Sequence, residues 1–232
     1  MSTFEETPFR LDDFPGTVRL FPLPNLVLFP HVMQPLHVFE PRYRDMLEDA
    51  MDDDHLIAMA VLKPGWEGNY EGRPSIYSVA CLGRIASCHQ LADGTYNVLM
   101  MGLQRVRLLG ELKSNDRFRT AIAELYEDNC PIGQAAGADL HDELRRAFMR
   151  LVPSMPDAHD HLEQLLGGDI PLGMLTDLIG YMLDIEISQK EALLAEPDIH
   201  RRAELLIEHL TAANARHQAT PGNVYPPTFS LN

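Results

Sequence analysis

Two patterns of apolar residues divide the chain near residue 128. Between Arg19 and about Tyr126, short apolar or alternating runs are separated by Pro, Gly, Asp and Asn, a pattern typical of β-strands. The runs are TVRLFPL (17–23), NLVLFP (25–30), QPLHVF (34–39), LIAMAVL (56–62), SIYSVACLGRIASCHQL (75–91), TYNVLMMGLQRVRLLGEL (95–112) and RTAIAELY (119–126). We therefore predict a β-rich unit over residues 15–128.

Prolines and one turn refine this prediction. Pro22, Pro24, Pro30 and Pro35 cannot donate to a strand ladder and are confined in sheets to edges, strand starts and bulges. They predict a strand that is repeatedly broken and re-aimed, as where a sheet curls into a barrel. The pair Asp93-Gly94 supplies positive φ between two strand-like runs and predicts a hairpin.

One short helix is expected within the β-rich unit. Pro41 suits a first helical turn, where its missing N–H costs nothing. The apolar residues that follow it share one helical face: Tyr43, Met46, Leu47, Ala50 and Met51. We expect this face to pack on the barrel.

After the linker EDNCPIGQAAG the apolar period changes to 3.6 residues. We predict a helical subdomain over residues 137–216, with Asp139 as the first N-cap and Ser188 with Glu191 as a capping box. Its helices are expected in ADLHDELRRAFMRLV, DAHDHLEQLLGG, DIPLGMLTDLIGYMLD, SQKEALL and PDIHRRAELLIEHL. Residues 217–232 form a flexible or docked tail in this reading.

Charge and cysteine content narrow the class of protein. The formal net charge of −15 makes the average surface repel phosphate backbones, so no nucleic acid partner is expected. Cys81, Cys88 and Cys130 match no zinc or redox spacing and are interpreted as reduced core thiols. The sequence also carries no signal peptide or membrane-span pattern, so we expect a cytoplasmic protein without a membrane partner.

The sequence lacks the common catalytic and cofactor motifs. The patterns GxxxxGK[ST], GxSxG, HExxH and GxGxxG are absent, so we predict no enzyme activity and no cofactor. His159 and His161 lie two residues apart, which places them on different sides of a helix, and the run 52–54 of three aspartates lacks a calcium-loop pattern. We therefore predict no metal site.

Aromatic residues in a Gly- and Pro-rich loop are the candidates for a binding site. Trp66, the sole tryptophan, lies with Pro64 and Tyr70 in KPGWEGNYEGRP. Exposed aromatics on a supported loop commonly contact polypeptides. We name Trp66, Tyr70, Pro64 and Tyr43 as candidate polypeptide contacts, with the alternative that Trp66 folds back as a lid over the barrel.

Three segments together resemble the N-terminal, substrate-binding domain of ATP-dependent Lon proteases. The first is LFPLPNLVLFPHVMQPLHVFEPRYRDML (20–47), and the second is CLGRIASCHQLADGTYNVLMMGLQRVRLL (81–109). The third, SQKEALLAEPDIHRRAELLIEHL (188–210), is similar to the family's helical segment with an Asp-x-x-x-Arg element. The resemblance spans most of residues 19–210.

The resemblance implies an α+β fold: a PUA-like β pseudo-barrel followed by a helical bundle subdomain. It assigns structural roles to the residues that match the family's motifs: Pro22, Phe29, Pro30, Pro35, Phe39, Glu40, Arg42, Gly83, Asp93, Gly94, Gly102 and Arg105. The ATPase module and the Ser-Lys protease module of full Lon proteases have no counterpart in this sequence. We therefore expect a free-standing domain of the Lon type.

The resulting hypothesis is a non-catalytic module that binds unfolded polypeptides or a partner protein, as an adaptor in protein quality control. It would act as a monomer or weak homodimer, with an ATPase or protease in trans as a further partner. The alternative is a small-ligand or nucleic-acid-sensing PUA-like domain, by analogy of fold alone. A cysteine peptidase is the third and least favoured hypothesis.

Overall fold

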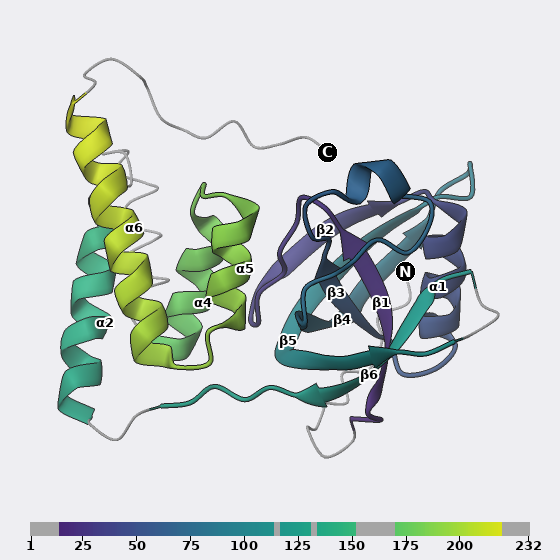
Figure 1. The fold of residues 1–232 in the computed structure, drawn as a ribbon, viewed down its shortest axis with the longest axis horizontal. Helices are drawn as coiled ribbons and strands as arrows, with labels where there is room; N and C mark the ends of the chain where they lie inside the picture. Colours follow the sequence, from purple (N-terminus) through teal and green to yellow (C-terminus); the bar gives the residue numbers. More distant parts are fainter. Residues whose placement is uncertain (1–13, 114–116, 131–133, 152–169, 220–232) are drawn as a thin grey trace. The chain divides into compact units, whose positions relative to one another are not determined.

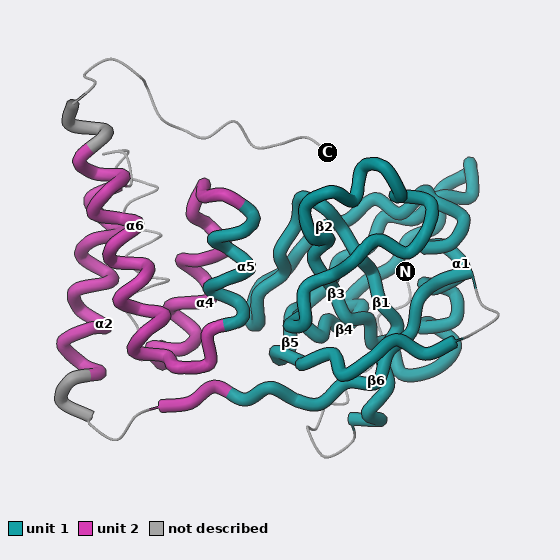
Figure 2. The backbone as a smooth tube through the Cα atoms, in the orientation of Figure 1, with its two compact units in different colours: residues 1–127, 187–195 teal, residues 128–186, 196–232 magenta. Residues whose placement is uncertain are grey.

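The computed structural model describes residues 14–113, 117–130, 134–151 and 170–219 (Figure 1). Contacts between Cα atoms divide the chain into two compact units, coloured separately in Figure 2. The first comprises residues 1–127 and 187–195, and the second comprises residues 128–186 and 196–232. A six-stranded sheet in the first unit and helices in the second confirm the predicted α+β class.

The first unit, hereafter the barrel unit, is built on one sheet with the strand order β2-β5-β4-β3-β1-β6. Its elements are β1 (Thr17–Leu23), β2 (Met33–Val38), α1 (Pro41–Met51), β3 (Leu56–Val61), η2 (Trp66–Asn69), β4 (Val79–Gln90), β5 (Tyr96–Glu111), β6 (Arg119–Leu125) and α5 (Ile187–Ala195). Strand β6 pairs with both β1 and β5, which closes the sheet into a ring. Only β1 and β3 pair in parallel, and β2 extends from the first half of β5 as an edge strand.

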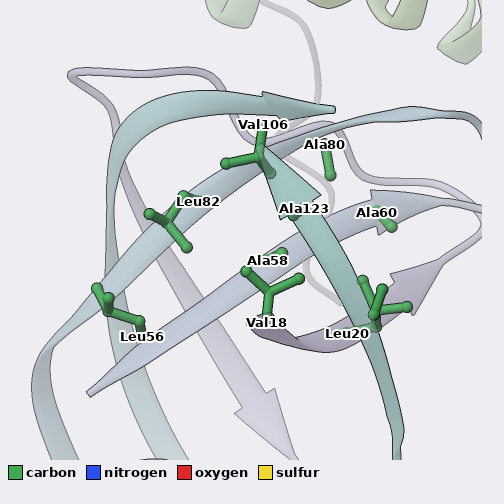
Figure 3. Close-up of a cluster of buried hydrophobic side chains, with 10 residues drawn as sticks. Val18, Leu20, Leu56, Ala58, Ala60, Ala80, Leu82, Val106 and Ala123 are labelled. Carbon is green, nitrogen blue, oxygen red and sulfur yellow. The ribbon is translucent and has the colours of Figure 1, made fainter. Parts of the chain in front are cut away.

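The interior of this ring is filled by small and branched side chains that alternate along the strands (Figure 3). Alternation places every second residue on the inner face, which the buried pairs Val18/Leu20 and Ala121/Ala123 illustrate. The cluster comprises Val18, Leu20, Leu56, Ala58, Ala60, Ala80, Leu82, Val106, Ala121 and Ala123. Half of these residues are alanine, and such short side chains allow opposite strands of a small barrel to approach each other.

The strand predicted for residues 25–30 is wrong. Residues 27–30 of this segment are buried, but the segment is irregular, because Pro24 precedes it, Pro30 ends it and the chain crosses β5 closely at Gly102. The His31 amide donates to the Gly102 carbonyl and the Gly102 amide donates to the Val32 carbonyl, both at 2.8 Å. The other predicted strands are confirmed within a few residues at their ends.

Helix α1 begins at Pro41 as predicted and buries Tyr43, Met46, Leu47 and Ala50. An arginine of β1 contacts the chain that follows this helix. The Arg19 guanidinium donates to Asp53 and Asp54, each at 2.7 Å, and also contacts the Asp49 carboxylate. Two of the three aspartates in the run 52–54 are thus ion-paired.

Helix α5 belongs to the barrel unit, whereas the sequence assigned it to the helical subdomain. It packs on β4 and buries Leu193 and Leu194 completely. The buried Arg105 of β5 donates from Nε to the Leu194 carbonyl at 2.8 Å. Because this contact satisfies a carbonyl near the end of α5, it fixes the helix on the sheet.

Glu191 of α5 supplies a pH-dependent prediction. Its side chain is buried, and burial raises its pKa above the ordinary value of 4.5, with Lys63 partly opposing the shift. The folded protein holds the Glu191 proton more tightly than the unfolded chain does. Stability is therefore highest below the pKa of Glu191 in the unfolded chain and is lost as the pH rises through its pKa in the folded protein. We expect Glu191→Gln to raise the unfolding midpoint in urea at pH 7 and to leave it unchanged at pH 4. Glu67→Gln, at an exposed glutamate, is the control, and equal effects of the two variants at pH 7 would refute the prediction.

The second unit, hereafter the helical unit, contains α2 (Gln134–Met149), α4 (Leu172–Met182) and α6 (Ile199–Ala219), and α2 and α4 both contact α6. At its centre lies Arg202, which is completely buried. Its guanidinium donates to both Asp128 oxygens, at 2.9 and 2.7 Å, and to Thr176 Oγ1 at 2.8 Å, and lies 3.8 Å from the buried Asp177. The cluster therefore joins α6 to α4 and to the segment that follows the barrel unit.

The helix ends differ in part from the predictions. Helix α2 begins at Gln134, so Asp139 lies within it, and α5 begins at Ile187, ahead of Ser188. Helix α6 follows Asp198, whose Oδ1 accepts from the His200 and Arg201 amides as an N-cap does. The predicted helix in DAHDHLEQLLGG and the 220–232 part of the predicted tail lie outside the described residues.

Candidate functional site

The loop between β3 and β4 carries the predicted aromatic contacts. Gly65, with φ of +89°, turns the chain into η2, and Trp66 and Tyr70 lie at the two ends of this short helix. Their rings meet edge to face with centroids 5.5 Å apart, and both side chains are half-buried. Pro64 is exposed just before them. The loop thus presents a paired aromatic surface, hereafter the Trp66–Tyr70 pair.

The start of α1 holds this loop in place. The Tyr70 hydroxyl donates to Glu40 Oε1 at 2.6 Å, and Arg42 Nη1 donates to the Tyr70 carbonyl at 3.2 Å. The Arg42 guanidinium also lies over the Tyr70 ring, 4.8 Å from its centroid. Burial and the bond to Glu40 raise the pKa of Tyr70. Glu40 and Arg42, predicted as structural motif residues, therefore anchor the candidate contact loop.

Tyr43 is less exposed than Trp66 and Tyr70. Its ring is buried against Phe21, with centroids 4.5 Å apart, and its hydroxyl donates to the Pro22 carbonyl at 3.2 Å. Burial raises its pKa. Tyr43 therefore packs α1 on β1 with little of its side chain exposed, although it also lines the pocket described below, and its role as a polypeptide contact stays a prediction.

An exposed apolar surface that the sequence reading missed lies on edge strand β2. Phe39 is 61% exposed, and Met33 and Met101 are exposed register partners on β2 and β5. We refer to Met33, Phe39 and Met101 together as the β2 apolar surface, in which Met33 begins β2, Met101 lies opposite it on β5 and Phe39 follows the last residue of β2. Phe39 had been assigned a structural role through its motif, but its exposure makes it a contact candidate instead. It directly precedes Glu40, the residue that holds Tyr70.

A pocket opens where the aromatic loop ends. Its volume is about 250 Å³, and its lining includes four arginines, Arg42, Arg73, Arg117 and Arg119, together with Glu71. These residues come from α1, the β3–β4 loop and the start of β6. No motif links such distant segments, so the sequence reading did not identify the pocket.

Three further motif residues, Gly83, Asp93 and Gly94, lie in turn and strand contacts of the barrel unit. Gly94 adopts φ of +82° in the hairpin between β4 and β5, and hydrogen bonds from Thr95 lower the pKa of Asp93. Gly83 pairs with Gly102 beside an irregularity in the β4–β5 register. A Cβ atom on Gly83 would lie 2.9 Å from the Met100 side chain, so the space at this crossing is small.

Metal-binding clusters and nucleophilic thiols are two kinds of group that support catalysis. Among the described residues, no cluster of three or more His, Cys, Asp or Glu side chains is placed to hold a metal ion. Cys81 is buried, and burial raises the pKa of the half-buried Cys88, which disfavours the nucleophilic thiolate. Cys130 is exposed, so its interpretation as a core thiol is wrong. Within the same residues, no helix has the length and apolar character that a membrane crossing requires.

Comparisons with known proteins agree on one family. Residues 17–212 match the family model described as the ATP-dependent protease La (LON) substrate-binding domain. The chain is 28% identical to Lon protease 2 of Myxococcus xanthus over 86% of its own length and 24% of that protein's. It is 26% identical to Lon protease 1 of Bdellovibrio bacteriovorus, over 87% of this chain and 25% of that protein. The chain thus spans about a quarter of the length of these curated relatives.

Two solved structures share the fold. A Lon N-terminal domain protein from Xanthomonas campestris superposes with a TM-score of 0.60 at 22% identity, covering 83% of this chain and 97% of that one. The N-terminal domain of the Mycobacterium avium complex Lon protease gives a TM-score of 0.67 at 15% identity, over 84% and 98% of the two chains. The predicted Lon N-domain type of fold is confirmed by these similarities.

Proposed function

Since this chain belongs to the ATP-dependent protease La (LON) substrate-binding domain family, we propose that it binds unfolded segments of other polypeptides without cleaving them. The finer proposal is an adaptor that acts in the cytoplasm and delivers bound chains to an ATPase or protease in trans. The β2 apolar surface is the observation that supports binding most directly. Large apolar side chains this exposed commonly mark interaction sites when they gather in one region.

The chemistry of this surface suits varied partners. Met33 and Met101 are flexible and polarisable, and methionine is over-represented on surfaces that bind many sequences. The Trp66–Tyr70 pair adds rigid aromatic area, which costs little conformational entropy on binding. The Tyr70 hydroxyl bonds to Glu40, which directly follows Phe39 in the chain, and on this link we treat the Trp66–Tyr70 pair and Phe39 as parts of one candidate site.

Binding can be tested with an unfolded, fluorescently labelled model protein by fluorescence anisotropy. We expect saturable binding that Phe39→Ala or Trp66→Ala weakens by about tenfold, the effect of losing about 1.4 kcal/mol at a central contact. Leu109→Ala is the matched control, because Leu109 is 58% exposed and lies in the half of β5 that does not pair with β2. Absence of binding to any unfolded protein, or equal effects of Phe39→Ala and Leu109→Ala, would contradict the proposal.

A further inference from the structure

The arginine-lined pocket beside the aromatic loop points to the chemistry of the bound polypeptide. We propose that this pocket binds a carboxylate of a chain whose apolar residue contacts the Trp66–Tyr70 pair. The inference rests on the proposed polypeptide binding and adds a charged group to what the site recognises. Guanidinium groups bind carboxylates through paired N–H donors, so several arginines around one cavity favour this ligand.

Two of the arginines form a fixed base for the pocket. Arg119 is buried, donates from Nε to Glu111 Oε2 at 2.9 Å, and donates from Nη1 to the Pro74 carbonyl at 2.9 Å. Arg42 donates from Nε to Glu40 Oε2 at 3.0 Å. Its Nη2 atom is buried and lies 2.9 Å from the same oxygen, yet makes no well-aligned hydrogen bond. These two arginines therefore supply fixed positive charge beside the pocket, whereas new hydrogen bonds to a ligand must come from the other two.

The other two arginines are held loosely. Arg73 is 48% exposed and lies 3.6 Å from Glu111, a carboxylate already bound by Arg119. Arg117 is 72% exposed and lies 3.5 Å from Asp45. Exposed ion pairs of this length contribute little energy, so both guanidinium groups can turn toward a ligand. The pocket thus combines anchored and movable cations.

The charge of the whole chain sharpens the assignment. With a formal net charge of −15, most of the surface repels carboxylates, whereas four of the 19 Lys and Arg residues line this single pocket. Glu40, Glu111 and Asp45 already pair with these arginines, and Glu71, the one carboxylate in the lining, also opposes an anionic ligand. Removing its charge should therefore strengthen binding.

The pocket is continuous with the aromatic surface. Arg42 lines the pocket and also lies over the Tyr70 ring, and Tyr70 directly precedes Glu71. A chain with an apolar residue against the Trp66–Tyr70 pair could place a neighbouring carboxylate among the arginines. That carboxylate could come from an Asp or Glu side chain or from the chain's own C-terminus.

Matched peptides without tryptophan can separate these sources. One apolar sequence is prepared with a free C-terminus, with a C-terminal amide, and as the amide carrying one internal Glu or the corresponding Gln. Trp66 is the only tryptophan of the protein, so its fluorescence reports binding next to the pocket. We expect at least one carboxylate peptide to bind about tenfold more tightly than its neutral partner, the difference shrinking as salt is added. The more strongly favoured of the two carboxylates identifies the source.

Variants of the loosely held arginines assign the effect to the pocket. The double variant Arg73→Gln, Arg117→Gln should abolish the preference for carboxylate and leave the affinity for the amide peptide unchanged, which also shows that the site is intact. Glu71→Gln should increase the preference. Arg107→Gln is the matched control, because Arg107 is 45% exposed, lies 3.4 Å from Glu124 and is not among the residues that line the pocket.

The outcomes separate this inference from the proposed function. If charged and neutral peptides bind equally, or the preference survives in the double variant, the carboxylate site is refuted and polypeptide binding stands. If neither the peptides nor an unfolded protein binds, polypeptide binding is refuted, and the carboxylate site that rests on it is refuted as well.

Discussion

Replacing Arg202 with alanine is expected to lower the free energy of unfolding of the helical unit by about 3–5 kcal/mol. The side chain is completely buried and binds Asp128 through two nitrogens while donating to Thr176. Its removal would leave carboxylates of the cluster, including the buried Asp177, without this cation. Urea unfolding followed by circular dichroism at the helical band would measure the loss.

The neighbouring residue provides the control for this prediction. Arg201 is exposed and pairs with Glu204 and Glu208 on the surface of α6. Arg201→Ala should change stability by no more than about 0.5 kcal/mol. The loss of stability for Arg202→Lys should lie between those for Arg201→Ala and Arg202→Ala, because lysine keeps the charge but lacks the paired N–H donors of arginine. Equal losses for Arg201→Ala and Arg202→Ala would show that the buried cluster does not stabilise the unit.

Gly102→Ala should be the most damaging small substitution in the barrel unit, with a loss of about 3 kcal/mol or more. A Cβ atom at this position would lie 2.0 Å from the Phe29 carbonyl oxygen, which is backbone and cannot move aside alone. Relief would require separation of β5 from the buried segment before β2, and with it the two hydrogen bonds at this crossing. The unfolding midpoint of the variant would measure the effect.

A substitution at Gly110 tests whether the loss of stability predicted for Gly102→Ala comes from steric overlap and not from the loss of a glycine. Gly110 lies in the same strand, and a Cβ atom there would have nothing within 4 Å. Gly110→Ala should therefore be neutral or slightly stabilising, because alanine restricts the unfolded chain. A loss for Gly110→Ala as large as that for Gly102→Ala would rule out the steric explanation.

The sequence predicted the local structure of the barrel well because strand burial follows a period of two. Val18 and Leu20 or Ala121 and Ala123 reveal the inner face by alternation alone. The Asp93-Gly94 turn could be predicted equally well, because the positive φ of Gly94 depends mainly on the residue being glycine. Residues 25–30 misled the prediction, because an apolar run that is buried by a chain crossing has the same composition as a buried strand.

The candidate site was harder to predict because its residues come from segments that are far apart in the sequence. Arg73 and Arg119 share Glu111 as a partner, although all three residues lie in different segments. The exposure of Phe39 depends on what the fold leaves uncovered beside β2, and the burial of Tyr43 depends on the packing of α1. Residue type alone therefore grouped the buried Tyr43 with the more exposed Trp66 and Tyr70 as candidate contacts.

The assignment of α5 to the barrel unit constrains any attempt to dissect this protein. The chain leaves the barrel unit after Glu127, returns to it for residues 187–195 and leaves it again. A fragment that stops at the apparent boundary near residue 128 would expose the face of β4 that α5 covers and deprive the buried Arg105 of the Leu194 carbonyl. Grafting or expressing the barrel by itself therefore calls for a shortened loop that retains α5, since a single cut cannot release it intact.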